Sequence, residues 1–238
     1  MECFIVQKEN IDLDRHTLVL VGDEAHHATR PLRIKPGDPL LATDLAGTCY
    51  RCHVERTENE TLPCFIEEIL PNFGEPKRDI LLIQGMIAQP SRWEFLLEKA
   101  TELGVKAIQP VITEHTERKS FNRERSERIL RAAVKQTKRA RMPELRELSS
   151  FTEALSQAMK EGRRGILLHE AANGSSSSSR SWPDNGKPIA IAVGPEGGFS
   201  EDEVRLALNA GAEIVSLGPR RLRAETAAIA SLAILIEQ

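Results

Sequence analysis

The sequence has few aromatic residues and no apolar run long enough to cross a membrane. Phe, Tyr and Trp make up only 4% of the 238 residues, so we expect an aliphatic core. A membrane helix needs about 20 consecutive apolar residues, and the longest run, at the C-terminus, is shorter. The N-terminus lacks a basic stretch followed by an apolar core, so it does not resemble a secretory signal. We therefore expect a cytoplasmic protein without a membrane segment.

A complete set of metal ligands is also missing. Cys49 and Cys52 form a C-x-x-C pattern, a histidine follows them, and Cys64 lies further on. A structural zinc site normally has a second ligand pair, so we expect reduced thiols; zinc binding or redox use is the less favoured alternative. His26 and His27 are adjacent but have no carboxylate–histidine constellation around them, and we expect no metal there.

Charge is distributed unevenly along the chain, although the net charge is only −3. Residues 1–70 contain seven Lys or Arg and thirteen Asp or Glu, whereas residues 118–141 contain ten Lys or Arg and two Glu. The two acids of this segment cannot neutralise its ten bases. This surplus favours contact with a nucleic acid over a solvated helix face laced with ion pairs.

The first 70 residues predict a small β-rich barrel or sandwich. Short apolar runs alternate with turn signals rich in Gly, Pro and Asp, and residues 24–38 predict a short helix and a turn. The expected strands are Phe4–Val6, Thr17–Val21, Leu40–Ala42, Cys49–Val54 and Pro63–Ile69. Residues 71–79 contain two prolines and a glycine and predict a linker. We therefore expect domains at 1–72 and 73–238.

The remaining chain alternates apolar runs with helical patterns, which indicates an α/β domain with a parallel sheet. Capping boxes predict two helix starts, at Ser150 and Ser200. The last helix, 227–236, is apolar nearly all round, so it must be buried in its own core or against a second subunit. Residues 173–186 are rich in serine and predict a mobile surface loop. The expected strands are Ile80–Gln84, Val105–Ile112, Gly165–Glu170, Ile189–Val193 and Glu213–Leu217.

Two bends near the C-terminus carry the most informative residues. The first reads GPEGGFS from Gly194, and the second reads LGPRRLRAET from Leu217. Each follows an expected strand, and ligands of open α/β sheets bind outside the carboxyl ends of the strands. The first bend is neither a Walker loop nor a G-x-G-x-x-G motif. Its glycines are also consistent with a tight strand-to-helix turn that binds no ligand. The arginines of the second bend and Glu225 either pair with one another or face an anionic ligand.

These two bends, in this order, resemble the RsmE family of SPOUT (knotted) methyltransferases. Other stretches are also similar to the family: HHATRPLR from His26, KATELGV from Lys99, TEH from Thr113 and QTKRARMPEL from Gln136. The chain departs from the family pattern at several positions, which affect the RNA-facing side and leave intact the loops expected to hold a cofactor. They are Thr29, Pro31, His115, Lys135, Lys138 and Ala224.

The resemblance implies an enzyme that transfers a methyl group from S-adenosylmethionine to N3 of a uridine in small-subunit ribosomal RNA. It also implies a PUA-like RNA-binding domain, a methyltransferase domain with a trefoil knot, and a homodimer. Backbone groups of the bends and of one further loop are expected to hold the cofactor. These residues are Leu168, His169, Glu170, Val193, Gly194, Pro195, Glu196, Gly197, Gly198, Leu217, Gly218, Arg220 and Leu222.

Deprotonating a uridine imide needs a proton acceptor and cations that stabilise the resulting charge. Arg223 and Arg139 are the expected cations, and Glu114 or Glu225 is the expected acceptor; both glutamates could instead be structural partners of the arginines. The residues expected to touch RNA are His27, Arg30, Arg33, Arg118, Lys119, Lys135, Lys138 and Arg141.

Two other functions remain open at this stage. A ribose 2′-O-methyltransferase of the same superfamily has a Ser-Leu-Asn run after the last strand, and Ser216-Leu217-Gly218 opposes that reading. A ribosome-assembly factor that only binds RNA would not need the two intact bends.

Overall fold

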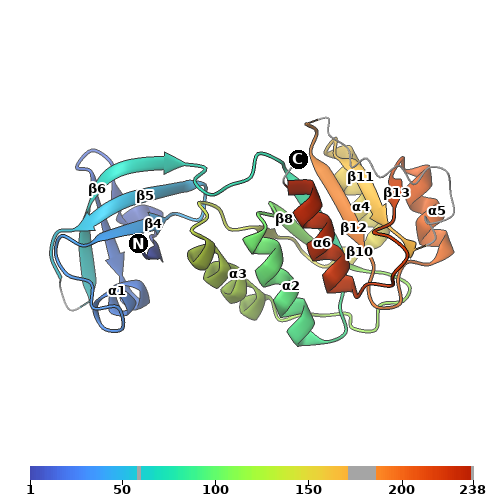
Figure 1. The fold of residues 1–238 in the computed structure, drawn as a ribbon, viewed down its shortest axis with the longest axis horizontal. Helices are drawn as coiled ribbons and strands as arrows, with labels where there is room; N and C mark the ends of the chain where they lie inside the picture. Colours follow the sequence, from blue (N-terminus) through green and yellow to red (C-terminus); the bar gives the residue numbers. More distant parts are fainter. Residues whose placement is uncertain (58–59, 171–185, 237–238) are drawn as a thin grey trace. The chain divides into compact units, whose positions relative to one another are not determined.

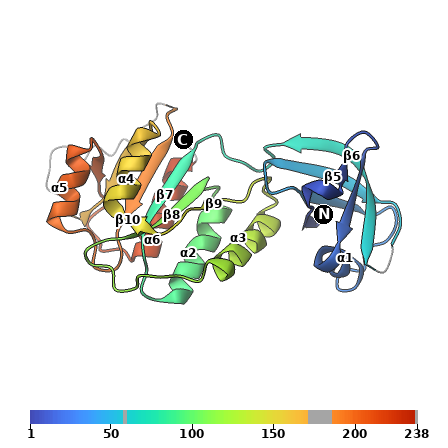
Figure 2. The same ribbon diagram turned by 180° about the vertical axis from the view of Figure 1, so that it is seen from behind.

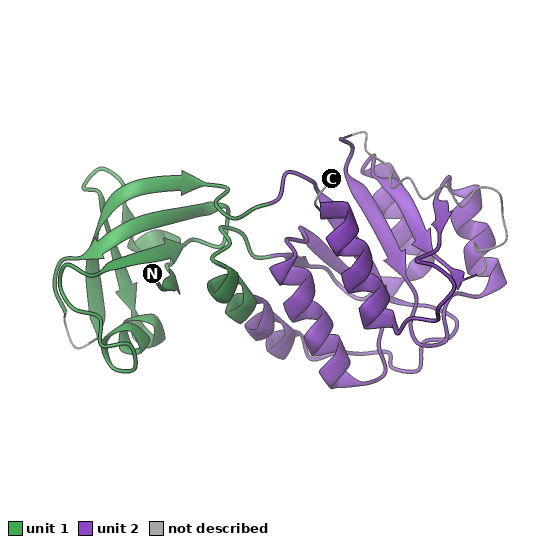
Figure 3. Cartoon of the chain, viewed as in Figure 1, with its two compact units in different colours: residues 1–75, 131–142 green, residues 76–130, 143–238 purple. Residues whose placement is uncertain are grey.

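The computed structural model describes residues 1–57, 60–170 and 186–236. They form two compact units, each considered by itself (Figure 3). The first unit comprises residues 1–75 and 131–142, and the second comprises residues 76–130 and 143–238. Helix α3 (Arg123–Thr137) begins in the second unit and ends in the first. The serine-rich segment expected to form a mobile loop falls almost entirely outside the described residues.

The first unit contains a six-stranded sheet in the order β1-β4-β5-β6-β3-β2. Only the β1–β4 pairing is parallel, and the other neighbours are antiparallel. The β-rich expectation is confirmed, including the short helix before the long turn. The elements are β1 (Cys3–Ile5), a 3₁₀ helix η1 (Lys8–Asn10), β2 (Ile11–Asp12), β3 (Thr17–Val21), α1 (Gly22–Thr29), β4 (Pro39–Thr43), β5 (Thr48–Val54) and β6 (Thr61–Pro71).

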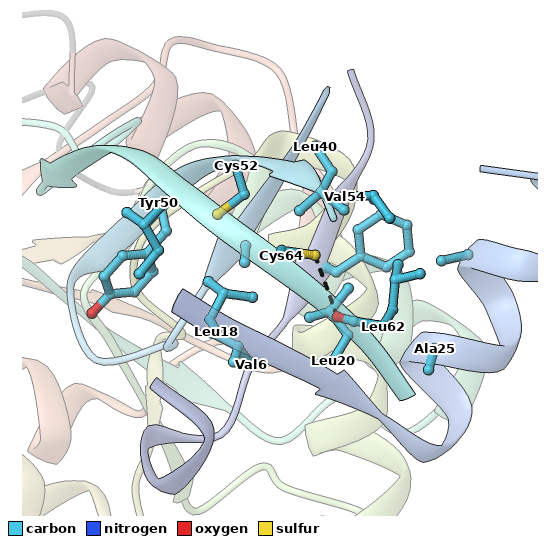
Figure 4. Packing of buried hydrophobic residues seen from close by; sticks show 14 residues of the cluster. Val6, Leu18, Leu20, Ala25, Leu40, Tyr50, Cys52, Val54, Leu62 and Cys64 are labelled. Carbon is cyan, nitrogen blue, oxygen red and sulfur yellow. Dashed lines mark hydrogen bonds between the residues drawn. The ribbon is translucent and has the colours of Figure 1, made fainter. Parts of the chain in front are cut away.

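The core of this unit is aliphatic and contains two of the thiols (Figure 4). Cys52 and Val54 alternate with exposed or half-buried neighbours along β5, as a strand with one buried face requires. All four cysteines are free and buried. Burial raises the pKa of the Cys64 thiol to about 12, and Cys64 Sγ donates to the Leu62 carbonyl at 3.3 Å. Among the described residues, no group of three or more His, Cys, Asp or Glu could hold a metal ion.

The second unit contains a seven-stranded sheet in which every pairing is parallel. The strand order is β10-β8-β7-β12-β11-β13, with β9 also paired to β8. The predicted α/β class is therefore confirmed. The elements are β7 (Ile80–Gly85), α2 (Pro90–Glu102), β8 (Ala107–Ile112), β9 (Glu144–Leu145), β10 (Ser149–Ser150), α4 (Phe151–Lys160), β11 (Arg164–Leu168), β12 (Ile189–Val193), α5 (Glu201–Asn209), β13 (Glu213–Val215) and α6 (Ala224–Ile236).

Helices cover both faces of this sheet (Figures 1 and 2). Helices α2 and α6 pack on one face, and α4 and α5 pack on the other. Strands β7 and β12 are consequently buried along their whole length, which explains their unbroken apolar sequences. Helix α6 packs against α2 and buries Ala228, Leu232 and Leu235. None of the helices in the described part of the chain is long and apolar enough to span a membrane.

The segment expected to be a linker is held by ion pairs at both ends. In the first unit, Glu75 pairs with Arg139 at 2.7 Å; in the second, Asp79 pairs with Arg163 and Lys106, each at 2.7 Å. The two units divide after residue 75, and residues 131–142 pack with the first unit. A single boundary at 72/73 does not describe the return of residues 131–142 to the first unit. That return depends on contacts between residues distant in sequence.

Candidate functional site

A cavity of about 840 Å³ opens at the carboxyl ends of three neighbouring parallel strands, β11, β12 and β13. It is lined by the loops that follow these strands. Every residue predicted to hold the cofactor lies in its lining, from Leu168–Glu170, Val193–Gly198 and Leu217–Leu222. The structure thus brings together residues more than 50 positions apart in the sequence. Their binding role itself stays a prediction.

Glycines of the first bend allow a close approach between loops. A Cβ atom on Gly197 would lie 2.6 Å from the Cβ of His115. A Cβ atom on Gly194 would lie 3.0 Å from the backbone of Gly198. By contrast, a side chain on Gly218 would meet no atom within 4 Å, and its φ of +108° favours glycine. The first bend is therefore tightly folded, and the second has open space beside Gly218.

Polar side chains tie the loops together. Arg221 Nη2 donates to the Glu196 carbonyl at 3.4 Å, and Arg221 Nε lies 3.3 Å from Glu170 Oε1. Arg221 was not among the predicted cofactor residues, although it lies within the second bend. Phe199, Ser216, Pro219 and Ala227 also line the cavity without having been predicted.

Gln84 is a supporting residue that sequence reasoning missed. It lies at the end of β7 and is fully buried. Its Nε2 donates to the Gly85 carbonyl at 3.0 Å and to the Gly194 carbonyl at 3.4 Å. Burial of a polar side chain at the carboxyl end of a parallel strand was the available signal. Gln84 fixes the start of the first bend against the central strand.

Two of the predicted catalytic residues lie at or beside the cavity. Arg223 is exposed and belongs to the lining. Glu225 follows at the start of α6 and is only 6% exposed. Its Oε1 lies 3.7 Å from Arg92 Nε, so its cationic neighbour is Arg92 instead of Arg223. Among the described residues, no group hydrogen-bonds to the buried Glu225 Oε2.

Glu114 lies beside the helix that follows the first bend. Its side chain is exposed, and its backbone N–H donates to Glu203 Oε1 at 3.0 Å. Glu203 also completes the capping box of α5 with Ser200. Glu114 is not part of the cavity lining, and its predicted role as proton acceptor stays a prediction.

Arg139 has a structural environment in the first unit. It is 2% exposed, and Nε and Nη2 donate to the two carboxylate oxygens of Glu75 at 3.2 and 2.7 Å. This paired geometry satisfies a buried guanidinium. Arg139 is not part of the cavity lining, and its predicted catalytic role also stays a prediction.

Several bases of residues 118–141 pair with acids in the fold, and the nucleic-acid contact expected of this segment stays a prediction. Acids elsewhere in the sequence supply the pairs: Lys135 with Glu24 at 2.8 Å, and Arg125 with Glu94 at 2.6 Å. A count of charges within one segment could not detect partners brought in by folding. Three of the remaining predicted RNA contacts, His27, Arg30 and Arg33, are exposed on the first unit; Lys119 is exposed, and Arg118, Lys138 and Arg141 are half-buried.

Comparison with known proteins agrees with this geometry. The family model described as RNA methyltransferase domain matches residues 74–236. The chain is 31% identical over 225 residues to ribosomal RNA small subunit methyltransferase E of Synechocystis sp., covering 91% of this chain and 72% of the relative. It is 26% identical over 233 residues to the protein of that name from Bacillus subtilis, covering 93% and 90%.

A solved structure extends the similarity to the fold. It is a ribosomal RNA small subunit methyltransferase E from Neisseria gonorrhoeae bound to S-adenosyl methionine, with a TM-score of 0.84 and 29% identity. The match covers 99% of this chain and 96% of the other. The chain therefore belongs to the RNA methyltransferase domain family and, within it, to the ribosomal RNA small subunit methyltransferase E family.

Proposed function

We propose that the protein transfers a methyl group from S-adenosylmethionine to N3 of a uridine in small-subunit ribosomal RNA. The observation that carries this proposal is the convergence of three loops, predicted to hold the cofactor, on one cavity. Family membership supports the reaction and the RNA class. The choice of N3 rests on the family resemblance of the two bends.

The cavity fits S-adenosylmethionine in its chemistry. At Gly198 and Gly218 no atom lies within 4 Å of where a side chain would begin, so the backbone of the two bends leaves room for an adenine edge and for the polar ends of the molecule. Leu168, Val193 and Leu217 supply apolar surface. When bound, this cofactor supplies a methyl group on a sulfonium, which needs no acid to leave.

The chain's own residues would then prepare the uridine. Arg223, at the mouth of the lining, stabilises negative charge on the uracil carbonyl oxygens as N3 loses its proton. Glu225 is the better-placed proton acceptor, because it directly follows Ala224 of the cavity lining and has a carboxylate oxygen without a partner among the described residues. Glu114 is the alternative. A cofactor held beside this nitrogen would supply the methyl group to the N3 lone pair.

We also propose the finer architecture that the resemblance implies: a PUA-like first unit, a trefoil knot in the loops of the second, and a homodimer. The second copy would cover apolar surface on α2 and α6. Phe95 of α2 is 47% exposed, and Ala233 of α6 is exposed. Such a protein would work in the cytoplasm, on RNA or on assembled small subunits.

Methyl transfer from labelled S-adenosylmethionine to small ribosomal subunits, followed by nucleoside analysis, tests the proposal. The expected product is uridine methylated at N3. A methyl group on the ribose would identify a 2′-O-methyltransferase instead, and RNA binding without any transfer would identify an assembly factor. Naked RNA and intact subunits should be compared in the same assay.

A further inference from the structure

A second cavity in the second unit lies where α2 and α3 begin. Its volume is about 480 Å³, within the range of pockets that hold small ligands. It shares no lining residue with the cofactor cavity. Its polar lining comes from Gln89, Ser91, Glu94, Arg118, Asn122 and Arg125.

Arg118 distinguishes this cavity from an ordinary surface depression. Its Nη1 atom is buried, and within the described part of the chain no group accepts a hydrogen bond from it. A guanidinium stays charged at any physiological pH. Arg118 as a whole is half-buried, but a buried donor without an acceptor is unfavourable, and an anionic group in the cavity would satisfy it.

The other charged groups of the cavity neutralise each other. Arg125 Nε lies 2.6 Å from Glu94 Oε1, and Arg125 Nη2 donates to Glu94 Oε2 at 2.8 Å. Trp93 Nε1 donates to the Ser126 hydroxyl at 3.2 Å, so this pair is also satisfied internally. Arg118 therefore gives the cavity a net positive charge, which selects an anion over a cation or an apolar group.

Helix α2 connects this cavity to the proposed reaction site. Arg92 stands between Ser91 and Trp93, both of which line the second cavity. Its Nε lies 3.7 Å from Glu225 Oε1, and Glu225 directly follows Ala224 of the cofactor cavity. One turn of α2 thus lines the second cavity and, through Arg92, contacts the residue next to the lining of the first.

We infer that the second cavity binds a phosphodiester group of the RNA substrate, with Arg118 as its cationic partner. This inference rests on the proposed function, because it takes RNA to be the substrate. It also separates Arg118 from other bases of its segment, since Lys135, Arg123 and Arg125 already pair with acids.

The test compares Arg118→Gln with Arg128→Gln in the full-length protein. Arg128 is exposed on the same segment and does not line the cavity, so both variants lose one positive charge. Binding of small-subunit ribosomal RNA is measured over a salt titration. Arg118→Gln should weaken RNA binding about tenfold. It should also reduce the salt slope, which is the change in log affinity per unit change in log salt concentration, by about one. Arg128→Gln should change affinity less than about twofold.

Two further measurements make the outcome specific. Arg118→Lys, which keeps the charge, should restore the salt slope, and calorimetry should give all variants the wild-type affinity for S-adenosylmethionine. Equal RNA affinities for Arg118→Gln and Arg128→Gln, or a loss of affinity with an unchanged slope, would overturn the inference. The proposed function fails separately, if the wild-type protein binds RNA through Arg118 but transfers no methyl group.

Discussion

Arg223 is the residue on which the proposed chemistry depends most. Because it lines the cavity from an exposed position, its removal should leave the fold and the loops around the cavity intact. We predict that Arg223→Ala binds S-adenosylmethionine normally but transfers methyl groups about 100-fold more slowly, as expected on losing one charge-stabilising group. Single-turnover methyl transfer and calorimetry measure the two properties.

Arg205→Ala is the matched control for this variant. Arg205 lies on α5, pairs with Asp202 and does not line the cavity, so the change should leave transfer at the wild-type rate. Wild-type transfer by Arg223→Ala would remove Arg223 from the mechanism.

Gly197 lies where the structure leaves no room for a side chain. An added Cβ would lie 2.6 Å from the Cβ of His115, which is closer than side-chain atoms approach. Gly197→Ala should lower the free energy of unfolding by about 1–3 kcal/mol and weaken binding of S-adenosylmethionine. Chemical denaturation and calorimetry measure these effects. The double variant Gly197→Ala/His115→Gly should recover much of the stability and of the cofactor affinity. If Gly197→Ala alone is as stable as the wild type, the close approach of Gly197 to His115 is not the reason for the glycine.

At the scale of elements, helix α5 begins directly after the first bend. Ser200 caps it with Glu203 in a reciprocal capping box, and Ser150 caps α4 with Glu153 in the same way. Either Ser→Ala change should cost about 1 kcal/mol in the free energy of unfolding. Only Ser200→Ala should also weaken S-adenosylmethionine binding, because Ser200 adjoins Phe199 of the cavity lining. If the two variants bind S-adenosylmethionine equally well, the cap at Ser200 does not contribute to cofactor binding.

Local sequence patterns predicted the longer elements because their causes are local. The capping boxes at Ser150 and Ser200 and the apolar run of β12 each act within a few residues. Strands β9 and β10 have only two residues each, which is too short for any periodicity. Their pairing with β8 depends on where the chain returns after α3, and no local pattern contains that information.

At the scale of the whole chain, an ion-pair network joins distant parts of the second unit. Arg163 pairs with Asp79 at 2.7 Å and with Glu161 at 2.9 Å. Burial raises the pKa of Asp79, but hydrogen bonds from Arg163 and Lys106 outweigh it and hold the pKa below its ordinary value. A carboxyl group with a lowered pKa in the folded state stabilises the fold at every pH above its ordinary, unfolded-state pKa. This stabilisation is lost as the pH falls through the lowered, folded-state pKa.

Asp79→Asn should therefore reduce the free energy of unfolding by about 1–3 kcal/mol at neutral pH. The deficit should shrink in acid, where the wild-type carboxylate also becomes protonated. Denaturation at several pH values measures this difference. Asp202→Asn, at an exposed pair on α5, should show little effect at any pH. A deficit for Asp79→Asn that does not vary with pH would show that the charge is not the cause.

The lining of the first cavity could be predicted because two contiguous bends carry motifs that resemble a known family, and that resemblance implied the third loop, Leu168–Glu170. The ion-pair partners of isolated residues could not be predicted from the sequence. The sequence places Glu24 more than 100 positions from Lys135 and Glu75 more than 60 from Arg139, so only the folded chain shows that these bases are paired. For the same reason, only the structure shows that Arg118 Nη1 is buried and has no partner among the residues it describes.

A crystal structure of the protein grown with S-adenosylmethionine tests the central claim most directly. The account predicts density for the cofactor inside the cavity formed by the loops after β11, β12 and β13, in contact with backbone near Gly198 and Gly218. Cofactor bound elsewhere on the second unit, with these loops unchanged and vacant, would contradict it.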